Sequence, residues 1–348
     1  MKFVACLIVV WIAVVSVHAD YSKNELAIEL IDELVNDLEF DRATLESVFA
    51  DAKFDPSIIK RMERPAESIN WHEYKEIFLQ PERTAAGVQF IKANIEDLRR
   101  AEETYKVPRH IIAAIIGVES YYGKFLGEHR VLDALATLGF DYPRRADFFR
   151  DQLRHFLILA CEERIKPFDL EDSCYRSSEY KSSGDGKEIG DLVGSYAGAM
   201  GYGQFIPESY RNFAVDFDLD GVRDIWTNTS DAIGSIANYF AEHGWNDDEE
   251  VLERVELNNQ PTQLEEIANS DLKPDRTAAE WRTLGVKTDA PDTSLAALFA
   301  FRLDGGQGPE RHDYVLGFDN FYVITRYNRS RLYARVVYEL ATDIRDNL

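Results

Sequence analysis

The sequence predicts a mainly α-helical protein of the α+β class, with a small β region toward the C-terminus. Apolar residues such as Leu26, Leu30 and Leu34 recur at helical spacing, and helical patterns continue to about residue 160. Phe, Tyr, Val and Leu concentrate instead at 294–303 and 312–327, stretches interrupted by glycines. A chain of 348 residues, 45% of them hydrophobic, is long enough to bury a sizeable core.

The first residues indicate an export signal. Lys2 supplies a positive start, residues 3–17 carry no charge, and Ala19 is a small residue suited to cleavage. The apolar run is shorter than the roughly 20 residues of a spanning helix, although an uncleaved anchor is the alternative. Cys6 precedes that run, a poor position for lipid attachment. We expect a soluble, exported protein cleaved after Ala19, with no transmembrane segment in the mature chain.

Helix signals continue along the chain. Asp41 or Asp55 is placed to cap a later helix, and residues 84–105 form an amphipathic pattern closed by Val107-Pro108. Residues 232–243 form a further helix that Gly244 stops, and a last helix starts near Ser330. Because there is no repeat and no long linker, the parts are expected to pack as one body. The predicted segments are a signal peptide at 1–19, an N-terminal helical region at 20–105, a central core region at 106–249, a β-containing region at 250–328 and a C-terminal helix at 329–348.

Charge and cysteines limit the choice of partners and compartment. The formal net charge of -23 disfavours nucleic acid and anionic lipid, because both repel an acidic surface. After signal cleavage two cysteines remain, Cys161 and Cys174, which form a candidate disulfide in an exported protein, with free thiols as the alternative. Ser, Gly, Lys, Asp and Glu dominate residues 171–191, a composition typical of an exposed loop.

Glu119 is the candidate catalytic residue. It follows the apolar stripe Ile112, Ile115 and Ile116 on one helix face, in a helix that Pro108 is suited to begin. A carboxyl at the end of such a stripe loses hydration, which raises its pKa toward the value that a general acid needs near neutral pH. The alternative is a glutamate that reaches solvent or pairs with an arginine.

A second informative segment spans residues 194–207. It holds four glycines with interleaved aromatic and small residues, so it cannot be a regular helix or strand throughout. Glycines allow a ligand close to the backbone, and aromatic rings offer faces to sugars. A tightly packed turn in the core is the alternative.

Together these segments carry a family resemblance. Gly117-Val118-Glu119-Ser120, followed by Gly198-Ala199-Met200-Gly201-Tyr202-Gly203-Gln204-Phe205-Ile206-Pro207, resembles the lytic murein transglycosylase B family. The resemblance extends over roughly residues 70 to 340, through the stretches 132–138, 142–145, 231–240 and 321–328. Several long motifs in the same order make it specific.

The resemblance implies a lysozyme-like helical core and a peptidoglycan lytic transglycosylase. Such an enzyme cleaves the β-1,4 bond between N-acetylmuramic acid (MurNAc) and N-acetylglucosamine (GlcNAc) and leaves 1,6-anhydro-MurNAc. One glutamate, here Glu119, would act as acid and then as base, with no catalytic cofactor. Two alternatives remain, a muramidase that hydrolyses the same bond and an inactive glycan-binding scaffold. Glycan strands, with cell-wall enzymes as further candidates, are the expected partners of a monomer.

The resemblance also implies substrate-binding residues. Ser195 and Gln204 match positions that line the sugar cleft. Arg144 and Arg145 match an arginine pair suited to carboxylates of the peptide stem, with surface salt bridges as the alternative. Further cleft positions, for which a place in the core is the alternative, are Tyr74, Tyr239, Tyr327, Asn328 and Tyr333.

A candidate calcium loop spans residues 216–231. Asp216, Asp218 and Asp220, followed by Gly221, match the first half of an EF-hand loop, in which Val222 would offer its carbonyl. Position twelve is Thr227 where that loop has Glu, and the resembled family closes on a later Asp that aligns with Asp231. Asp224 is the rival closing ligand, and a bare acidic turn is the alternative to a metal site. A structural calcium is therefore the expected ion.

Overall fold

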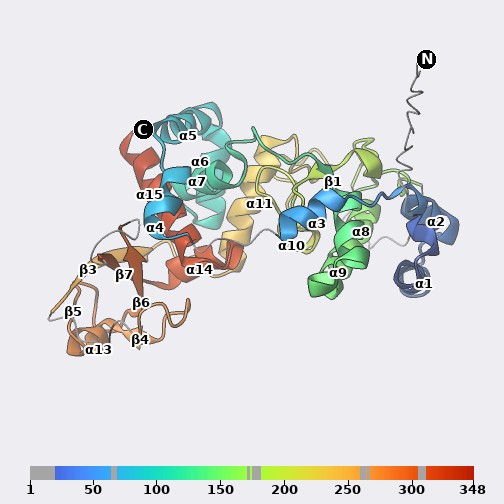
Figure 1. The fold of residues 1–348 in the computed structure, drawn as a ribbon. Coiled ribbons are helices and arrows are strands. Elements are labelled where there is room, and N and C mark those ends of the chain that lie inside the picture. The colour runs from blue at the N-terminus through green and yellow to red at the C-terminus, as the bar shows by residue number, and fades with distance from the viewer. Residues whose placement is uncertain are drawn as a thin grey trace, which may run out of the picture.

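The computed structural model describes residues 20–63, 69–170, 173–174, 182–258, 264, 267–304 and 311–348. The predicted signal at 1–19 lies outside these residues and stays a prediction. No helix in the described stretches is both long and apolar enough to cross a bilayer. The chain is predominantly helical with a small antiparallel sheet, as the sequence predicts (Figure 1).

Short capped helices open the described chain. They are the 3-10 helix η1 (Tyr21–Lys23) and the α-helices α1 (Glu25–Leu38), α2 (Arg42–Asp51) and α3 (Pro56–Met62). Asp41 and Asp55 both cap as predicted, accepting hydrogen bonds from the backbone N–H groups of Thr44 and Ser57. These helices pack against α8 (Val131–Asp141) and α9 (Ala146–Glu162), through contacts such as the pair between Glu33 and Arg154 at 2.5 Å.

The helices α4 (Trp71–Phe78), α5 (Pro81–Ala93) and α6 (Ile95–Tyr105) follow. The single helix expected over 84–105 is wrong, because the chain breaks at Asn94. There the backbone turns to φ -119° and ψ 30°, and the Asn94 side chain donates to the carbonyl of Phe90 at 2.9 Å, satisfying the end of α5. An apolar pattern that continues through both helices does not show such a break.

The central helix α7 (Arg109–Ser120) is almost entirely buried. It packs against α5, α6, α11 (Thr229–Glu242) and the last helix, α15 (Arg331–Asp346), which Ser330 caps. Figure 1 shows α4, α5, α6, α7 and α15 gathered at one end of the molecule and α1, α2, α8 and α9 at the other. The stretch 20–105 therefore contributes to both ends, with its later helices beside α7.

The sheet has the strand order β4-β6-β7-β3-β5 and is antiparallel throughout. Its strands are β3 (Leu252–Leu257), β4 (Arg276–Thr277), β5 (Val286–Lys287), β6 (Leu295–Arg302) and β7 (His312–Gly317), and the short helix α13 (Ala278–Thr283) lies between β4 and β5. The strand expected within 294–303 is confirmed by β6. A separate two-stranded ladder pairs β1 (His129–Arg130) with β2 (Val193–Gly194).

The β expectation for 312–327 holds only in its first half. The strand β7 ends at Gly317, and α14 (Asp319–Tyr327) follows as a helix. Phe321, Ile324 and Thr325 are buried at helical spacing, so burial against the core selects the helix over the β preference of the aromatic and branched residues.

The exposed loop expected at 171–191 is wrong for several described residues, since Ser173, Cys174 and Ser182 are buried. Cys174 is joined to Cys161, at the end of α9, by a disulfide. The Ser183 backbone N–H donates to the Gly221 carbonyl at 2.8 Å, which ties this segment to the acidic loop. The short helix η4 (Ile189–Asp191) then leads into β2, while 171–172 and 175–181 lie outside the described residues.

Candidate active site

Glu119 occupies the penultimate position of α7. The apolar stripe that precedes it is fully buried, because Ile112, Ile115 and Ile116 are each 0% exposed. Glu119 itself keeps partial exposure at the helix end. Burial raises the pKa of the Glu119 carboxyl to about 7, and the hydrogen bond from Tyr333, which favours the carboxylate, opposes that rise. A carboxylic acid with this pKa can both give and take a proton near neutral pH.

Tyrosines from helices distant in sequence surround this carboxyl. The Tyr333 hydroxyl, on α15, donates to Glu119 Oε1 at 2.6 Å. Burial and the Glu119 charge raise the pKa of Tyr333 and of Tyr327, so both phenols stay neutral hydrogen-bond donors. The same two causes raise the pKa of Tyr74, on α4, to about 12. The structure thus brings Tyr74, Tyr327 and Tyr333 to the candidate acid.

The glycine-rich segment forms a tight turn beside the acid. Met200 and Phe205 exchange two backbone hydrogen bonds of 2.9 Å. The Tyr327 hydroxyl donates to the Gly203 carbonyl at 2.5 Å. A Cβ on Gly203 would lie only 2.7 Å from the Tyr327 hydroxyl oxygen. Ser120, next to Glu119, donates to the Tyr202 carbonyl at 2.8 Å. Glycine at 203 is therefore required for the close approach of tyrosine and backbone.

Ser195 and Gln204 lie on this turn and keep it in shape. The Ser195 hydroxyl oxygen accepts the backbone N–H groups of Ala197 and Ala199 at 3.2 and 3.1 Å, which leaves its own hydrogen to donate. Gln204 adopts a left-handed backbone with φ 51°, and its amide nitrogen donates to the Gly201 carbonyl at 2.9 Å. Both side chains are partly exposed.

The remaining sequence-predicted residues make no contact with Glu119 within the described stretches. Tyr239 is behind Tyr327, at 4.8 Å between ring centroids, and donates to the Arg326 carbonyl at 2.7 Å. Asn328 is an exposed residue at the end of α14. Arg144 and Arg145 are exposed on the short helix η2 (Pro143–Arg145), between α8 and α9. No contact among the described residues joins either arginine to Glu119.

Tyr122 packs against the helix that carries the candidate acid but was not a sequence candidate. It adopts a left-handed backbone with φ 59°, and its hydroxyl donates to the Arg83 carbonyl at 3.0 Å. A Cβ on Gly87 or on Gly117 would lie 2.4 or 2.6 Å from that hydroxyl, so both glycines make room for the ring. The Arg83 guanidinium in turn donates to the Gly117 carbonyl. The signal in the sequence is a glycine inside α7, two residues before the acid.

The acidic loop between α10 (Pro207–Phe213) and α11 gathers three carboxylates. Asp216, Asp218 and Asp231 each offer an oxygen within 4.8 Å of the others. Burial first, and then the charges of Asp218 and Asp216, raise the pKa of Asp231 to about 7. Its two oxygens accept the backbone N–H groups of Phe217 and Asp224, both at 2.7 Å.

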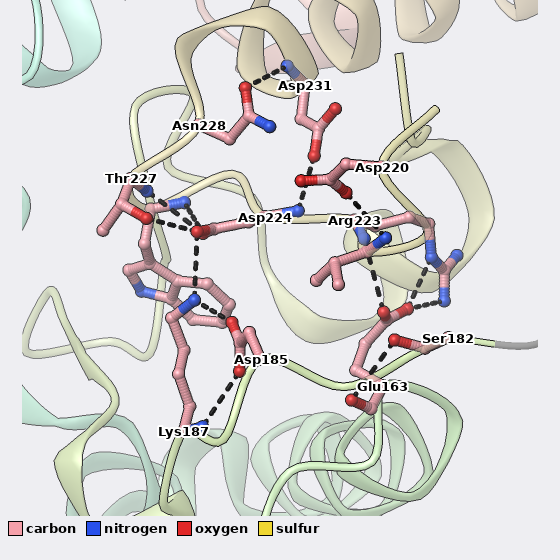
Figure 2. A network of polar contacts seen from close by, with 12 residues as sticks. Glu163, Ser182, Asp185, Lys187, Asp220, Arg223, Asp224, Thr227, Asn228 and Asp231 are labelled. Atoms are coloured by element: carbon pink, nitrogen blue, oxygen red, sulfur yellow. Dashed lines mark hydrogen bonds and ion pairs between the residues drawn. The ribbon is translucent and has the colours of Figure 1, made fainter. Parts of the chain in front are cut away.

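Asp224, the rival closing ligand, is engaged elsewhere. Figure 2 shows its carboxylate turned toward Thr227 and Lys187, away from the Asp231 carboxylate. Lys187 donates to it at 3.0 Å and also bonds Asp185. The exposed Asp220 accepts the Val222 backbone N–H at 2.9 Å.

A helical body that carries a glutamate of raised pKa at a helix end, tyrosines beside that glutamate and a small antiparallel sheet is typical of a lysozyme-like class of glycan-cleaving proteins. A family model for the transglycosylase SLT domain matches residues 23–342. The chain belongs to this family. The resemblance found in the sequence motifs is confirmed.

Relatives cover nearly the whole chain. It is 36% identical over 337 residues to the membrane-bound lytic murein transglycosylase B of Escherichia coli, covering 94% of this chain and 84% of the relative. The crystal structure of soluble lytic transglycosylase SltB1 of Pseudomonas aeruginosa superposes with a TM-score of 0.81 at 41% identity, covering 92% and 99% of the two chains. The lytic transglycosylase Slt35 of Escherichia coli, solved in complex with calcium, superposes with a TM-score of 0.78 at 35% identity, covering 94% and 95%.

Proposed function

We propose that the chain is a peptidoglycan lytic transglycosylase that cleaves the MurNAc–GlcNAc β-1,4 bond and forms 1,6-anhydro-MurNAc. The observation that carries this proposal is the state of Glu119. It is a carboxyl with a pKa of about 7, held at a helix end by Tyr333. The murein transglycosylase B of Escherichia coli and SltB1 support the choice of substrate.

One carboxyl is sufficient for the whole reaction. Protonated Glu119 gives its proton to the glycosidic oxygen while the bond from that oxygen to MurNAc C1 breaks, and GlcNAc leaves with a hydroxyl at O4. The resulting carboxylate takes the proton of the MurNAc C6 hydroxyl, whose oxygen bonds to C1. Glu119 ends protonated and no water is consumed. The Tyr333 hydroxyl stabilises the carboxylate between the two proton transfers.

The two alternatives are less well supported. A hydrolase uses a second carboxyl roughly 5–5.5 Å away for retention or 6.5–9.5 Å for inversion. Repulsion from such a neighbour would raise the pKa of Glu119. Within the described residues, the causes of its pKa of about 7 are burial, which raises the pKa, and the Tyr333 hydrogen bond, which lowers it. An inactive scaffold has no need for an acid whose pKa is tuned to about 7.

The sequence-predicted cleft residues take binding roles in this proposal. Ser195 keeps a hydrogen to donate to a sugar oxygen, and Gln204 lies on the same turn. Tyr74 lies close enough to Glu119 for the Glu119 charge to raise its pKa. The Tyr239 ring packs against the Tyr327 ring, and the exposed Asn328 follows Tyr327 in the chain. Arg144 and Arg145 are exposed and suited to carboxylates of the peptide stem, beyond the sugars.

We further propose that the acidic loop binds a structural calcium ion. The described donor set fits a hard cation, because three carboxylates present oxygens to one small volume and Gly221 turns the chain with φ 93°. Asp231 closes the site and Asp224 does not, since Lys187 neutralises Asp224. Asp220 and the Val222 carbonyl complete the proposed ligands. Slt35, solved with calcium, supports the choice of ion.

The location and assembly of the protein are part of the same proposal. Residues 1–19 direct export, cleavage after Ala19 releases a periplasmic monomer, and no catalytic cofactor takes part. Other cell-wall enzymes are its candidate protein partners. We keep the proposed division of the mature chain, within one packed body, into the segments 20–105, 106–249, 250–328 and 329–348.

The deciding experiment is mass spectrometry of fragments released from purified peptidoglycan by residues 20–348. The expected products end in anhydro-MurNAc, one water lighter than hydrolysis products. They should disappear with Glu119→Gln and persist with Glu128→Gln, a matched change at an exposed glutamate. Reducing-end products would establish the hydrolase, and wild-type activity in Glu119→Gln would overturn the mechanism.

A further inference from the structure

A cavity of about 250 Å³ lies where the helices α4 and α15 begin, against strands β6 and β7. Its lining residues are Ile69, Asn70, Trp71, Asn269, Ala300, Phe301, Arg302, His312, Arg331 and Leu332. Trp71 and Phe301 meet edge to face at 5.7 Å and give it an apolar side. The sequence motifs and the proposed mechanism leave this cavity unexplained.

Arg331 is the unusual group in the cavity. Its Nε is buried and has no hydrogen-bond partner, and no ion pair or hydrogen bond of its guanidinium occurs within the described residues. Burial lowers the pKa of Arg331. The Arg331 side chain is partly exposed while its Nε is buried without a partner, so the guanidinium can still take an anion from outside the chain.

The neighbours of Arg331 do not satisfy it. Arg302 has its own acidic partner in Asp304 at 2.9 Å, and His312 contributes a ring that contacts Tyr314. The amides at the cavity are also engaged: Asn70 caps α4, and Asn269 bonds the backbone of Ala300. A ligand that fits must therefore bring its own negative charge and an apolar portion.

The cavity is linked to the candidate active site by the two helices that form its wall. The helix α4 carries Tyr74 one turn beyond Trp71, and α15 carries Tyr333 two residues beyond Arg331. Both tyrosines interact with Glu119. The cavity and the candidate acid are thus connected through the first turns of the same two helices.

We propose that this cavity binds a carboxylate of the peptide stem that hangs from MurNAc, with the Arg331 guanidinium as its anchor. The inference rests on the proposed function, because only a peptidoglycan substrate brings such a stem. It is separate from Arg144 and Arg145, which lie on η2 between α8 and α9 in the chain, and Figure 1 shows α8 and α9 apart from α4 and α15. Stems on either side of the cleaved bond then meet different arginines.

The test compares two substrates, glycan strands that carry stem peptides and the same strands freed of them by an amidase. For Arg331→Gln we expect KM on stem-bearing strands to rise about tenfold or more, the range for lost hydrogen bonds to a charged group. On stem-free strands kcat and KM should match the wild type. Arg331→Lys should give only partial rescue, because lysine keeps the charge and loses the planar fork. Arg329→Gln, at an exposed arginine two residues earlier, is the matched control.

A binding measurement separates this proposal from the proposed function. Calorimetry with free stem tripeptide requires no cleavage, and the wild type should bind it more tightly than Arg331→Gln does. Equal tripeptide binding by both, or a KM change of equal size on both substrates, would overturn the assignment of the cavity. Tripeptide binding that depends on Arg331 in a protein that cleaves nothing would support the cavity and reject the transglycosylase.

Discussion

Replacing Tyr333 with phenylalanine isolates one of the two causes that set the pKa of Glu119. Burial raises this pKa to about 7 and the hydrogen bond from Tyr333 lowers it, so removal of the hydroxyl leaves burial unopposed. The acid must be protonated to start the reaction. Activity therefore falls as pH rises through the pKa of Glu119, and in Tyr333→Phe this fall should move to higher pH.

The size of the shift follows from the hydrogen bond. A bond to a charged group contributes about 1.5–3 kcal/mol, and each pH unit corresponds to about 1.4 kcal/mol. The protonated carboxyl is also stabilised in part by the Tyr333 hydroxyl, so the lower end of this energy range applies. The basic limb of the pH profile should therefore move by about one pH unit. The Tyr333–Glu119 distance of 2.6 Å is short enough for the whole effect to be present.

The assay is the pH dependence of kcat on a defined glycan oligomer. Tyr327→Phe is the control, since the Tyr327 hydroxyl donates to the Gly203 carbonyl and makes no hydrogen bond to Glu119. That variant should keep the wild-type basic limb even if its overall rate falls. A basic limb in Tyr333→Phe that stays in place or moves to lower pH would refute this account of the acid.

The remaining predictions concern the supports of the site. Tyr122→Phe loses the hydrogen bond to the Arg83 carbonyl and should cost about 1 kcal/mol of unfolding free energy. We also expect kcat to fall while KM stays unchanged. The control is Tyr196→Phe, at an exposed tyrosine, and equal kinetics of the two variants would argue against a positioning role for Tyr122. Calcium at a hundred times its Kd should add about 2.7 kcal/mol to the stability and raise Tm. Asp231→Asn should abolish that response and Asp224→Asn should keep it, while a wild-type Tm equal in chelator and in excess calcium would remove the metal from the proposal.

Local patterns predicted much of the helical body. The caps at Asp41 and Asp55 act within three residues of their partners, so the sequence contains all that is needed to find them. The stripe before Glu119 likewise predicts burial from spacing alone. The helix at 319–327 was missed because aromatic and branched residues favour strands, and only packing against the core separates the two outcomes.

Composition misjudged the segment around Cys174 for a different reason. Ser, Lys and Asp are typical of exposed loops, but here polar groups are paired within the fold. Ser182 is buried and bonds the Glu163 carbonyl, and Lys187 lies between Asp185 and Asp224 (Figure 2). Such pairing permits burial of polar side chains, and it depends on partners that are 19 and 37 residues away.

The same distinction between local and distant causes explains what could be inferred of the candidate acid. The burial that raises the pKa of Glu119 was predicted from the apolar stripe on its own helix, which is readable from four residues of sequence. The hydrogen bond that lowers this pKa comes from Tyr333, 214 positions away, and no spacing rule connects the two. Only the family resemblance placed Tyr333 near the cleft. The direction of the pKa shift could therefore be predicted from the residues, whereas its final value of about 7 depends on how α15 packs against α7.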